Sequence, residues 1–194
     1  MAIKKRPVSP RQKMINLMYV VLMAMLALNV STEVLNGFSI VEESLVRTTA
    51  NSAKENQVVY DDFLAQMKAN PAKVKAWFDK AREVKRMSDS LYNFADELKW
   101  AIVREADGDK ADIKNIRNKE SLEAAAQVML APGRGQGGAL RKAIDSFRER
   151  ILTMVTDPTQ RQLIASNLST QVPRHTTTLG RNWQEYMFED MPTA

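Results

Sequence analysis

Cysteine is absent from the 194 residues, and histidine occurs once, at position 175. The missing thiols exclude disulfides, thiolate metal sites and cysteine nucleophiles. A single histidine without cysteine cannot complete a zinc site, and His175 sits beside Arg174 in a segment expected to be a surface loop. Carboxylates fall on the solvent faces of predicted helices, where they usually lie. We find no catalytic residues, metal ligands or cofactor site, and expect a protein that is not an enzyme.

Acidic residues are also missing from the first 32 positions, which hold no Asp, Glu or His. Five basic residues lie there, so the whole net charge of +5 sits at the N-terminus: Lys4, Lys5, Arg6, Arg11 and Lys13. The remainder of the chain is electrically balanced, which argues against nucleic-acid binding despite the basic total. A basic flank before an apolar run is typical of a membrane segment whose N-terminus stays in the cytoplasm.

That apolar run, Leu17 to Leu28, is unbroken over twelve residues if Tyr19 is included. A bilayer core needs about 20 mostly apolar residues, so the run must be extended by helix at its ends. Ser9 as N-cap, Pro10 at the first helical position and Gln12 as capping-box partner predict such an extension. We therefore expect a cytoplasmic N-terminus at 1–9 and a transmembrane helix at 10–33. The alternatives are a signal peptide, although no small-x-small cleavage site follows promptly, or a helix in a soluble core.

The predicted membrane helix has two different sides at 100° per residue. One side is expected to face a partner subunit: Arg11, Ile15, Met18, Leu22, Met25 and Asn29. The opposite side is smaller and is expected to serve self-association: Val20, Ala24, Ala27 and Ser31. Arg11 either reaches the lipid headgroups or pairs with a carboxylate of another membrane subunit. Because residues 1–32 contain no carboxylate or histidine, any proton-carrying group must belong to that partner.

The rest of the chain, 34–194, predicts an antiparallel bundle and an all-α fold. We expect one long helix from Pro10 to Lys68, with Gly37 as its one kink, and Asn70-Pro71 starting a helix of about 35 residues. The aromatic residues of that second helix are expected in the core: Trp77, Phe78, Tyr92, Phe94 and Trp100. After a turn at 107–109, further helices are expected at 120–131, 139–156 and 158–168, with a short aromatic segment at 182–190.

The segment from Gly133 to Gly138 satisfies G-x-G-x-x-G, and Asp157 follows at about the distance expected of a dinucleotide-binding fingerprint. The fingerprint requires a preceding β-strand, whereas residues 124–131 predict a helix. We therefore interpret the glycines as a flexible connection.

Two motifs near the N-terminus carry a family resemblance. Pro10-Arg-Gln-Lys-Met-Ile-Asn-Leu-Met-Tyr19 is followed by Ala27-Leu-Asn-Val-Ser31, and the later Asn182-Trp-Gln-Glu-Tyr186 agrees with them. Together these resemble the GldM/PorM family, the inner-membrane motor subunits of type IX secretion and gliding motility. The resemblance spans nearly all of the chain.

The resemblance implies a homodimeric, single-pass subunit of the bacterial inner membrane, with most of the chain in the periplasm. It implies a surrounding ring of GldL/PorL-like polytopic subunits, whose proton flow drives rotation. It also implies that Arg11 pairs with a glutamate of the ring. Further periplasmic domains, expected beyond this chain, would reach the outer-membrane secretion apparatus. The alternative from the residues alone is a membrane-anchored periplasmic sensor or scaffold stalk without motor activity.

Overall fold

The computed structural model describes residues 9–28, 32–173 and 180–193, leaving aside the side chains of 24–28 and 32. Every regular element in these ranges is helical, which confirms the all-α class for the described residues. The elements are α1 (Pro10–Leu28), α2 (Thr32–Ala69), α3 (Pro71–Asp107), the 3-10 turn η1 (Gly108–Lys110), α4 (Glu123–Leu130), α5 (Gly137–Met154), α6 (Pro158–Asn167) and α7 (Trp183–Phe188).

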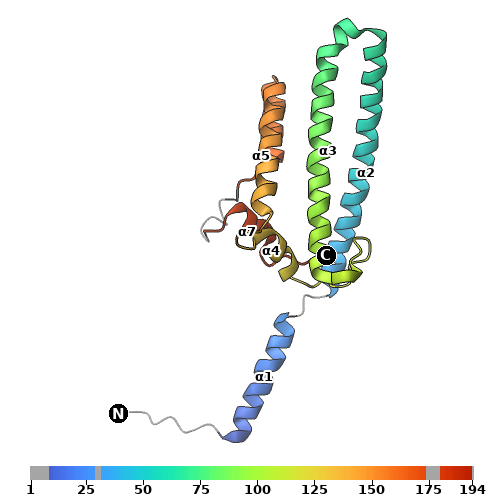
Figure 1. Ribbon diagram of the computed structural model, residues 1–194. Helices are drawn as coiled ribbons and strands as arrows, with labels where there is room; N and C mark the ends of the chain where they lie inside the picture. The colour runs from blue at the N-terminus through green and yellow to red at the C-terminus, as the bar shows by residue number, and fades with distance from the viewer. Residues whose placement is uncertain (1–8, 29–31, 174–179, 194) are drawn as a thin grey trace.

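Helices α2 and α3 form a long antiparallel hairpin (Figure 1). Asn70 and Pro71 make the turn. Proline suits the first position of a helix, because the N–H that it lacks would have no carbonyl partner within the helix. Asn70 makes no capping hydrogen bond with its side chain, so the start of α3 depends on Pro71. Near the turn Tyr60 of α2 packs on Phe78 of α3, with ring centroids 5.8 Å apart.

The aromatic residues of α3 divide between core and solvent. Phe78 is buried and Phe94 is half-buried, as expected. The prediction is wrong for Trp77, Tyr92 and Trp100, which are 61%, 58% and 42% exposed. Neighbouring positions on a helix differ by 100°, so Trp77 cannot share the direction of Phe78 toward α2. The face of α3 that packs on other helices is too narrow to cover all five aromatic residues.

Helices α4 and α7 lie beside the lower end of α3, and α5 extends from there up along α3 toward the hairpin turn (Figure 1). Helix α5 runs antiparallel to α3, and Arg150 of α5 pairs with Glu83 of α3 at 2.7 Å. The shared core contains the most buried apolar residues of this region: Leu98, Val103, Ala124, Ala125, Met129 and Trp183. The predicted packing of antiparallel helices is therefore present, as a hairpin plus a cluster of shorter helices.

Helix α7 is set by a reciprocal capping box. The Asn182 side chain accepts from the Glu185 N–H at 3.0 Å, and the Glu185 carboxylate accepts from the Asn182 N–H at 2.7 Å. This satisfies two N–H groups that the first helical turn leaves without partners. The cap directs Trp183 into the core, where it meets Phe188 edge to face. The short aromatic segment predicted at 182–190 therefore forms α7, with Trp183 in the core.

The structure does not establish the predicted single helix from Pro10 to Lys68. The structure gives two helices, α1 and α2, and the joint at 29–31 lies outside the described residues. Gly37 lies within α2, with nothing within 4 Å of the position that a β-carbon would take.

Candidate functional site

The first turn of α1 is capped by Ser9. Its Oγ accepts from the N–H of Gln12 at 3.3 Å, and its carbonyl accepts from the N–H of Lys13 at 3.0 Å. The predicted capping box is wrong in one respect, since the Gln12 side chain donates to Asn16 instead. The cap fixes Arg11 in the first turn, where its side chain is exposed. The structure therefore places a cation at the start of an apolar helix.

From Met14 to Met23 the apolar side chains of α1 are exposed by 47% to 74%, except for Ile15, which is half-buried. Helix α1 contacts no other helix of the described structure. Fully burying a large apolar side chain stabilises by about 1.5–3 kcal/mol, so covering α1 would contribute several times that amount. No helix among the described residues is both long and apolar enough to cross a bilayer.

The structure describes only some residues of the two predicted sides of α1. Arg11, Ile15, Met18 and Leu22 follow one another up one side of a regular helix, and Val20 lies opposite. Ile15 and Met18 line a shallow apolar groove with three neighbours, Met14, Leu17 and Val21. The backbone stays helical through the positions of Ala24, Met25 and Ala27, whose side chains are not described. Asn29 and Ser31 lie outside the described residues, so both sides remain predictions.

Helix α2 carries an exposed apolar stripe that we call the α2 stripe: Val34, Phe38, Val41 and Leu45, with exposures of 49%, 43%, 55% and 61%. The spacing of four, three and four residues is that of a coiled-coil seam. The sequence revealed this spacing, but we used it only as a sign of helix. The exposed fractions of these side chains show that no other described part of the chain covers the stripe.

The base of α2 is tied to the rest of the domain by the connection that follows α3. Lys119 donates from Nζ to the Ser39 hydroxyl at 3.1 Å. Thr193 in turn donates to the carbonyl of Ser121 at 2.9 Å, so the last described segment meets the same connection. Leu35, beside these contacts, is 7% exposed. No local pattern predicts these links, because they join residues 72 and 80 positions apart.

Asp107 organises this connection at its start. Its carboxylate accepts from the backbone N–H groups of Arg117 and Asn118, both at 2.8 Å. These hydrogen bonds stabilise the charged form and hold the pKa of Asp107 below its ordinary value. The carboxylate therefore closes the loop that presents Lys119 to α2.

The glycine-rich segment is a tight turn against α4. A helix, α4, precedes it where a dinucleotide site would need a strand. A β-carbon on Gly135 would lie 2.6 Å from the carbonyl oxygen of Met129, and one on Gly137 would lie 2.9 Å from the same atom. The glycines permit close packing of backbone on backbone, which replaces the flexible connection that we expected. Asp157 instead caps α6: its carboxylate accepts a hydrogen bond from the N–H of Thr159 at 3.2 Å.

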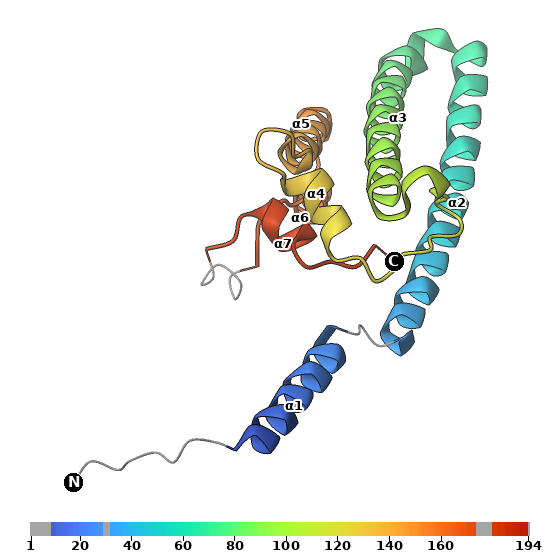
Figure 2. The ribbon, with the colours of Figure 1, turned by 60° about the horizontal axis from the view of Figure 1, so that its bottom comes forward.

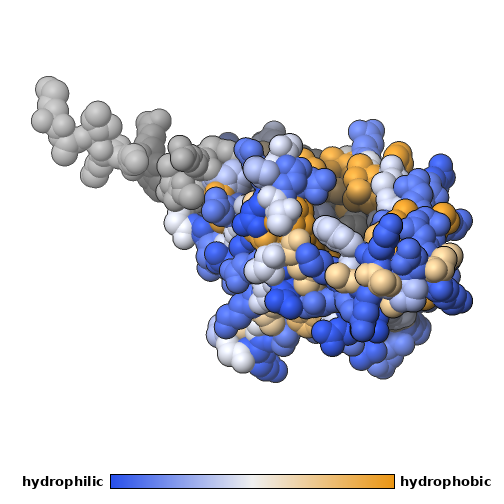
Figure 3. Space-filling model, turned by 90° about the horizontal axis from the view of Figure 1, so that it is seen from above, coloured by the Kyte–Doolittle hydropathy of each residue, from blue (hydrophilic) through white to orange (hydrophobic). Residues whose placement is uncertain are grey.

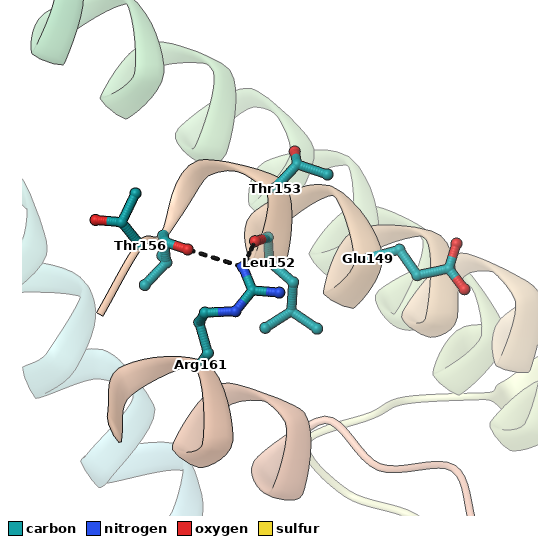
Figure 4. A pocket seen from close by; sticks show the side chains of 6 residues that line it. Glu149, Leu152, Thr153, Thr156 and Arg161 are labelled. Atoms are coloured by element: carbon teal, nitrogen blue, oxygen red, sulfur yellow. Dashed lines mark hydrogen bonds between the residues drawn. The ribbon is translucent and has the colours of Figure 1, made fainter. Parts of the chain in front are cut away.

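A pocket opens between the end of α5 and α6, lined by Glu149, Leu152, Thr153, Val155, Thr156 and Arg161 (Figure 4). The Arg161 guanidinium donates through Nη1 to the carbonyls of Leu152 and Val155. It thereby satisfies carbonyls that the end of α5 leaves without partners. The pocket's one cation is thus engaged in holding α6 against α5.

No group of acidic or histidine side chains in the described ranges is arranged to hold a metal ion. His175 lies outside those ranges. The features that remain for function are surfaces: α1, the α2 stripe and the outward end of the hairpin.

Comparison with known proteins identifies the domain that carries the α2 stripe and the outward end of the hairpin. The family model described as the GldM N-terminal domain matches residues 33–194, from the start of α2 through the last helix. No curated protein matches the chain. The match excludes α1, whose family resemblance depends on the motif around Arg11. Since the match covers most of the chain and nearly all of the helical domain, the protein belongs to the GldM/PorM family.

Proposed function

We propose that this chain is a single-pass inner-membrane subunit of a proton-driven rotary motor. As a GldM/PorM protein it is a component of the type IX secretion and gliding machinery. The observation that carries the more specific role is α1: an exposed apolar helix with Arg11 in its first turn, placed directly before the family domain. A helix of this kind requires cover by lipid or by apolar partners. The chain has no enzymatic part in this proposal.

Arg11 is the residue proposed to meet the partner. An arginine in the membrane stabilises a nearby carboxylate in its charged form and lowers the pKa of that carboxylate. Protonation of the carboxylate removes the attraction and releases the pair. One charge moving through 100 mV supplies about 2.3 kcal/mol, which is enough to drive such a release. The proposed partner is a ring of GldL/PorL-like polytopic subunits, with the GldM-type chain at its centre.

Two copies of the chain are proposed to form that centre. The small side of α1 suits close approach of two helices in lipid: Val20, Ala24, Ala27 and Ser31. Outside the membrane, the α2 stripe has the spacing and exposure that a parallel coiled coil requires. A homodimer would cover both surfaces at once. Domains beyond this chain are proposed to carry the rotation to the outer-membrane apparatus.

The test exchanges Arg11 within the full-length protein in its native host. Arg11→Ala should leave the protein in the membrane at normal abundance, with the ring partner co-purifying, but abolish secretion or gliding. Arg11→Lys should retain part of the activity, because it keeps the charge and loses only the planar fork of donors. Lys13→Ala is the matched control, since it removes a cation from the same helical turn on another side.

Normal secretion by an assembled Arg11→Ala complex would remove Arg11 from the mechanism. Failure of the chain to co-purify with any polytopic membrane protein would instead favour a sensor or scaffold stalk.

A further inference from the structure

The outward end of the hairpin is strongly basic. We call residues 66–82 the hairpin tip: it joins the last turn of α2 to the first three turns of α3. Five of its side chains are basic and only Asp79 is acidic, which gives a net charge of +4: Lys68, Lys73, Lys75, Lys80 and Arg82. Beyond residue 30 the chain as a whole is neutral, so the tip is a local concentration of positive charge.

The lysines of the tip are not neutralised by the fold. Asp79 pairs with Arg82 at 3.1 Å, and the four lysines form no ion pair within the described part of the chain. Farther down α3, lysines do pair with carboxylates, as Lys85 does with Asp89 at 2.8 Å. Unopposed like charges on one helix end repel one another, so an anionic partner would relieve that repulsion.

A tryptophan stands among these lysines. Trp77 is 61% exposed, and the Nζ of Lys80 lies 4.9 Å from the centre of its ring system. Trp77 is the only large apolar side chain with high exposure between Leu64 and Tyr92. An indole face carries negative charge density and attracts the positively polarised C–H groups of a ligand. The tip thus offers an exposed indole with the Lys80 ammonium over one face of its ring and the other lysines of the tip nearby.

The tip is also free of the rest of the domain. Helix α2 carries it about 57 Å from the α1 end, at 1.5 Å per residue over its 38 residues. The pair between Arg150 and Glu83 is made just below the tip, on the inner side of α3. Figure 3 looks down on this end of the molecule and shows a mainly hydrophilic face. The tip therefore remains accessible at the end of a long arm.

We propose that the hairpin tip binds a carboxylate-bearing glycan of the cell wall. A sugar ring would stack on Trp77, and carboxylates on the same polymer would pair with Lys73 and Lys80, which lie on the same side of α3 as Trp77. This inference rests on the proposed function, which puts the hairpin in the periplasm, where such a glycan lies. A bilayer fits less well, because one isolated tryptophan gives little apolar area for insertion and the arm points away from α1.

The experiment is co-sedimentation of the purified, detergent-solubilised chain with insoluble peptidoglycan sacculi. The wild-type chain should pellet with the sacculi at low salt and be released by about 0.5 M salt, where exposed charges are largely screened. Trp77→Ala and the double variant Lys73→Glu/Lys80→Glu should each lower the bound fraction at least fivefold. The matched controls are Trp100→Ala, another exposed tryptophan of α3, and Lys114→Glu/Lys142→Glu, two exposed lysines away from the tip.

Thermal melts by circular dichroism should be unchanged for the tip variants, because the altered side chains are exposed. Wild-type protein that stays in the supernatant, or tip variants that bind as well as the controls, would overturn the proposal. Equal or stronger binding to vesicles of anionic phospholipid would overturn it in favour of a lipid surface. These results are independent of secretion by Arg11→Ala, so failure of the glycan proposal and failure of the motor proposal are separable.

Discussion

The α2 stripe gives the sharpest test of assembly. We predict that Val41→Ser/Leu45→Ser weakens the proposed homodimer while the monomer stays folded. Both side chains point away from the core, with exposures of 55% and 61%, so folding of one chain does not depend on them. Their apolar surface becomes useful only when a second α2 covers it.

The expected size follows from those exposures. Covering the exposed half of a valine or leucine side chain stabilises by about 1 kcal/mol. Two substitutions then cost about 2 kcal/mol per protomer and about 4 kcal/mol in a symmetric dimer, since each stripe is present twice. At 1.4 kcal/mol per tenfold change, the dissociation constant should rise by close to a thousandfold.

Sedimentation analysis of the detergent-solubilised chain over a concentration series measures this constant. The matched control is Ile40→Ser/Val58→Ser, because both residues are 69% exposed on another side of α2. The control should leave the dissociation constant within about threefold of the wild-type value. The absence of native cysteine permits a second readout, since Phe38→Cys should form a disulfide-linked dimer and Ile40→Cys should not. A dimer that survives the stripe variant, or falls apart equally in the control, would refute a coiled coil at α2.

Four further variants test how the domain is held together. Lys119→Ala should lower the free energy of unfolding by about 1 kcal/mol in urea titrations, because it removes the hydrogen bond to Ser39. Gly135→Ala should destabilise by about 1–3 kcal/mol, since its β-carbon would lie 2.6 Å from a carbonyl oxygen of α4, whereas Gly37→Ala should raise the melting temperature. Asp107 has a lowered pKa when folded, so its contribution is present above its unfolded value of 3.8 and is lost as pH falls through the folded value. Asp107→Asn should therefore flatten the decline of the urea midpoint between pH 6 and pH 3, and an unchanged slope would contradict the reasoning.

The helix boundaries were the part of the fold that sequence predicted best. Asn70-Pro71, Asp107-Gly108 and Asp157-Pro158 all mark real ends, because proline and glycine act on the backbone of their own neighbours. Local chemistry of this kind needs no knowledge of the tertiary structure. The family match to residues 33–194 confirmed the resemblance that the short motifs had indicated.

Burial was predicted less well, because it depends on how many neighbours a helix has. Trp77, Tyr92 and Trp100 were assigned to the core on residue type, but α3 has partners on only part of its circumference. The exposure of Trp77 then supplied part of the evidence for the hairpin tip. The links made by Lys119 and Thr193 could not be foreseen, since no local pattern connects positions so far apart.

Two hydrogen bonds, Lys119 to Ser39 of α2 and Thr193 to Ser121, link the base of α2 to the last described segment, and this link has a mechanical consequence. A twist applied at the start of α2 would pass through Lys119 and the connection around Ser121 to Thr193, within a few hydrogen bonds (Figure 2). It would not need to travel up one limb of the hairpin and down the other. The long hairpin would then turn in step with its base, and its distal end would follow the rotation of α2.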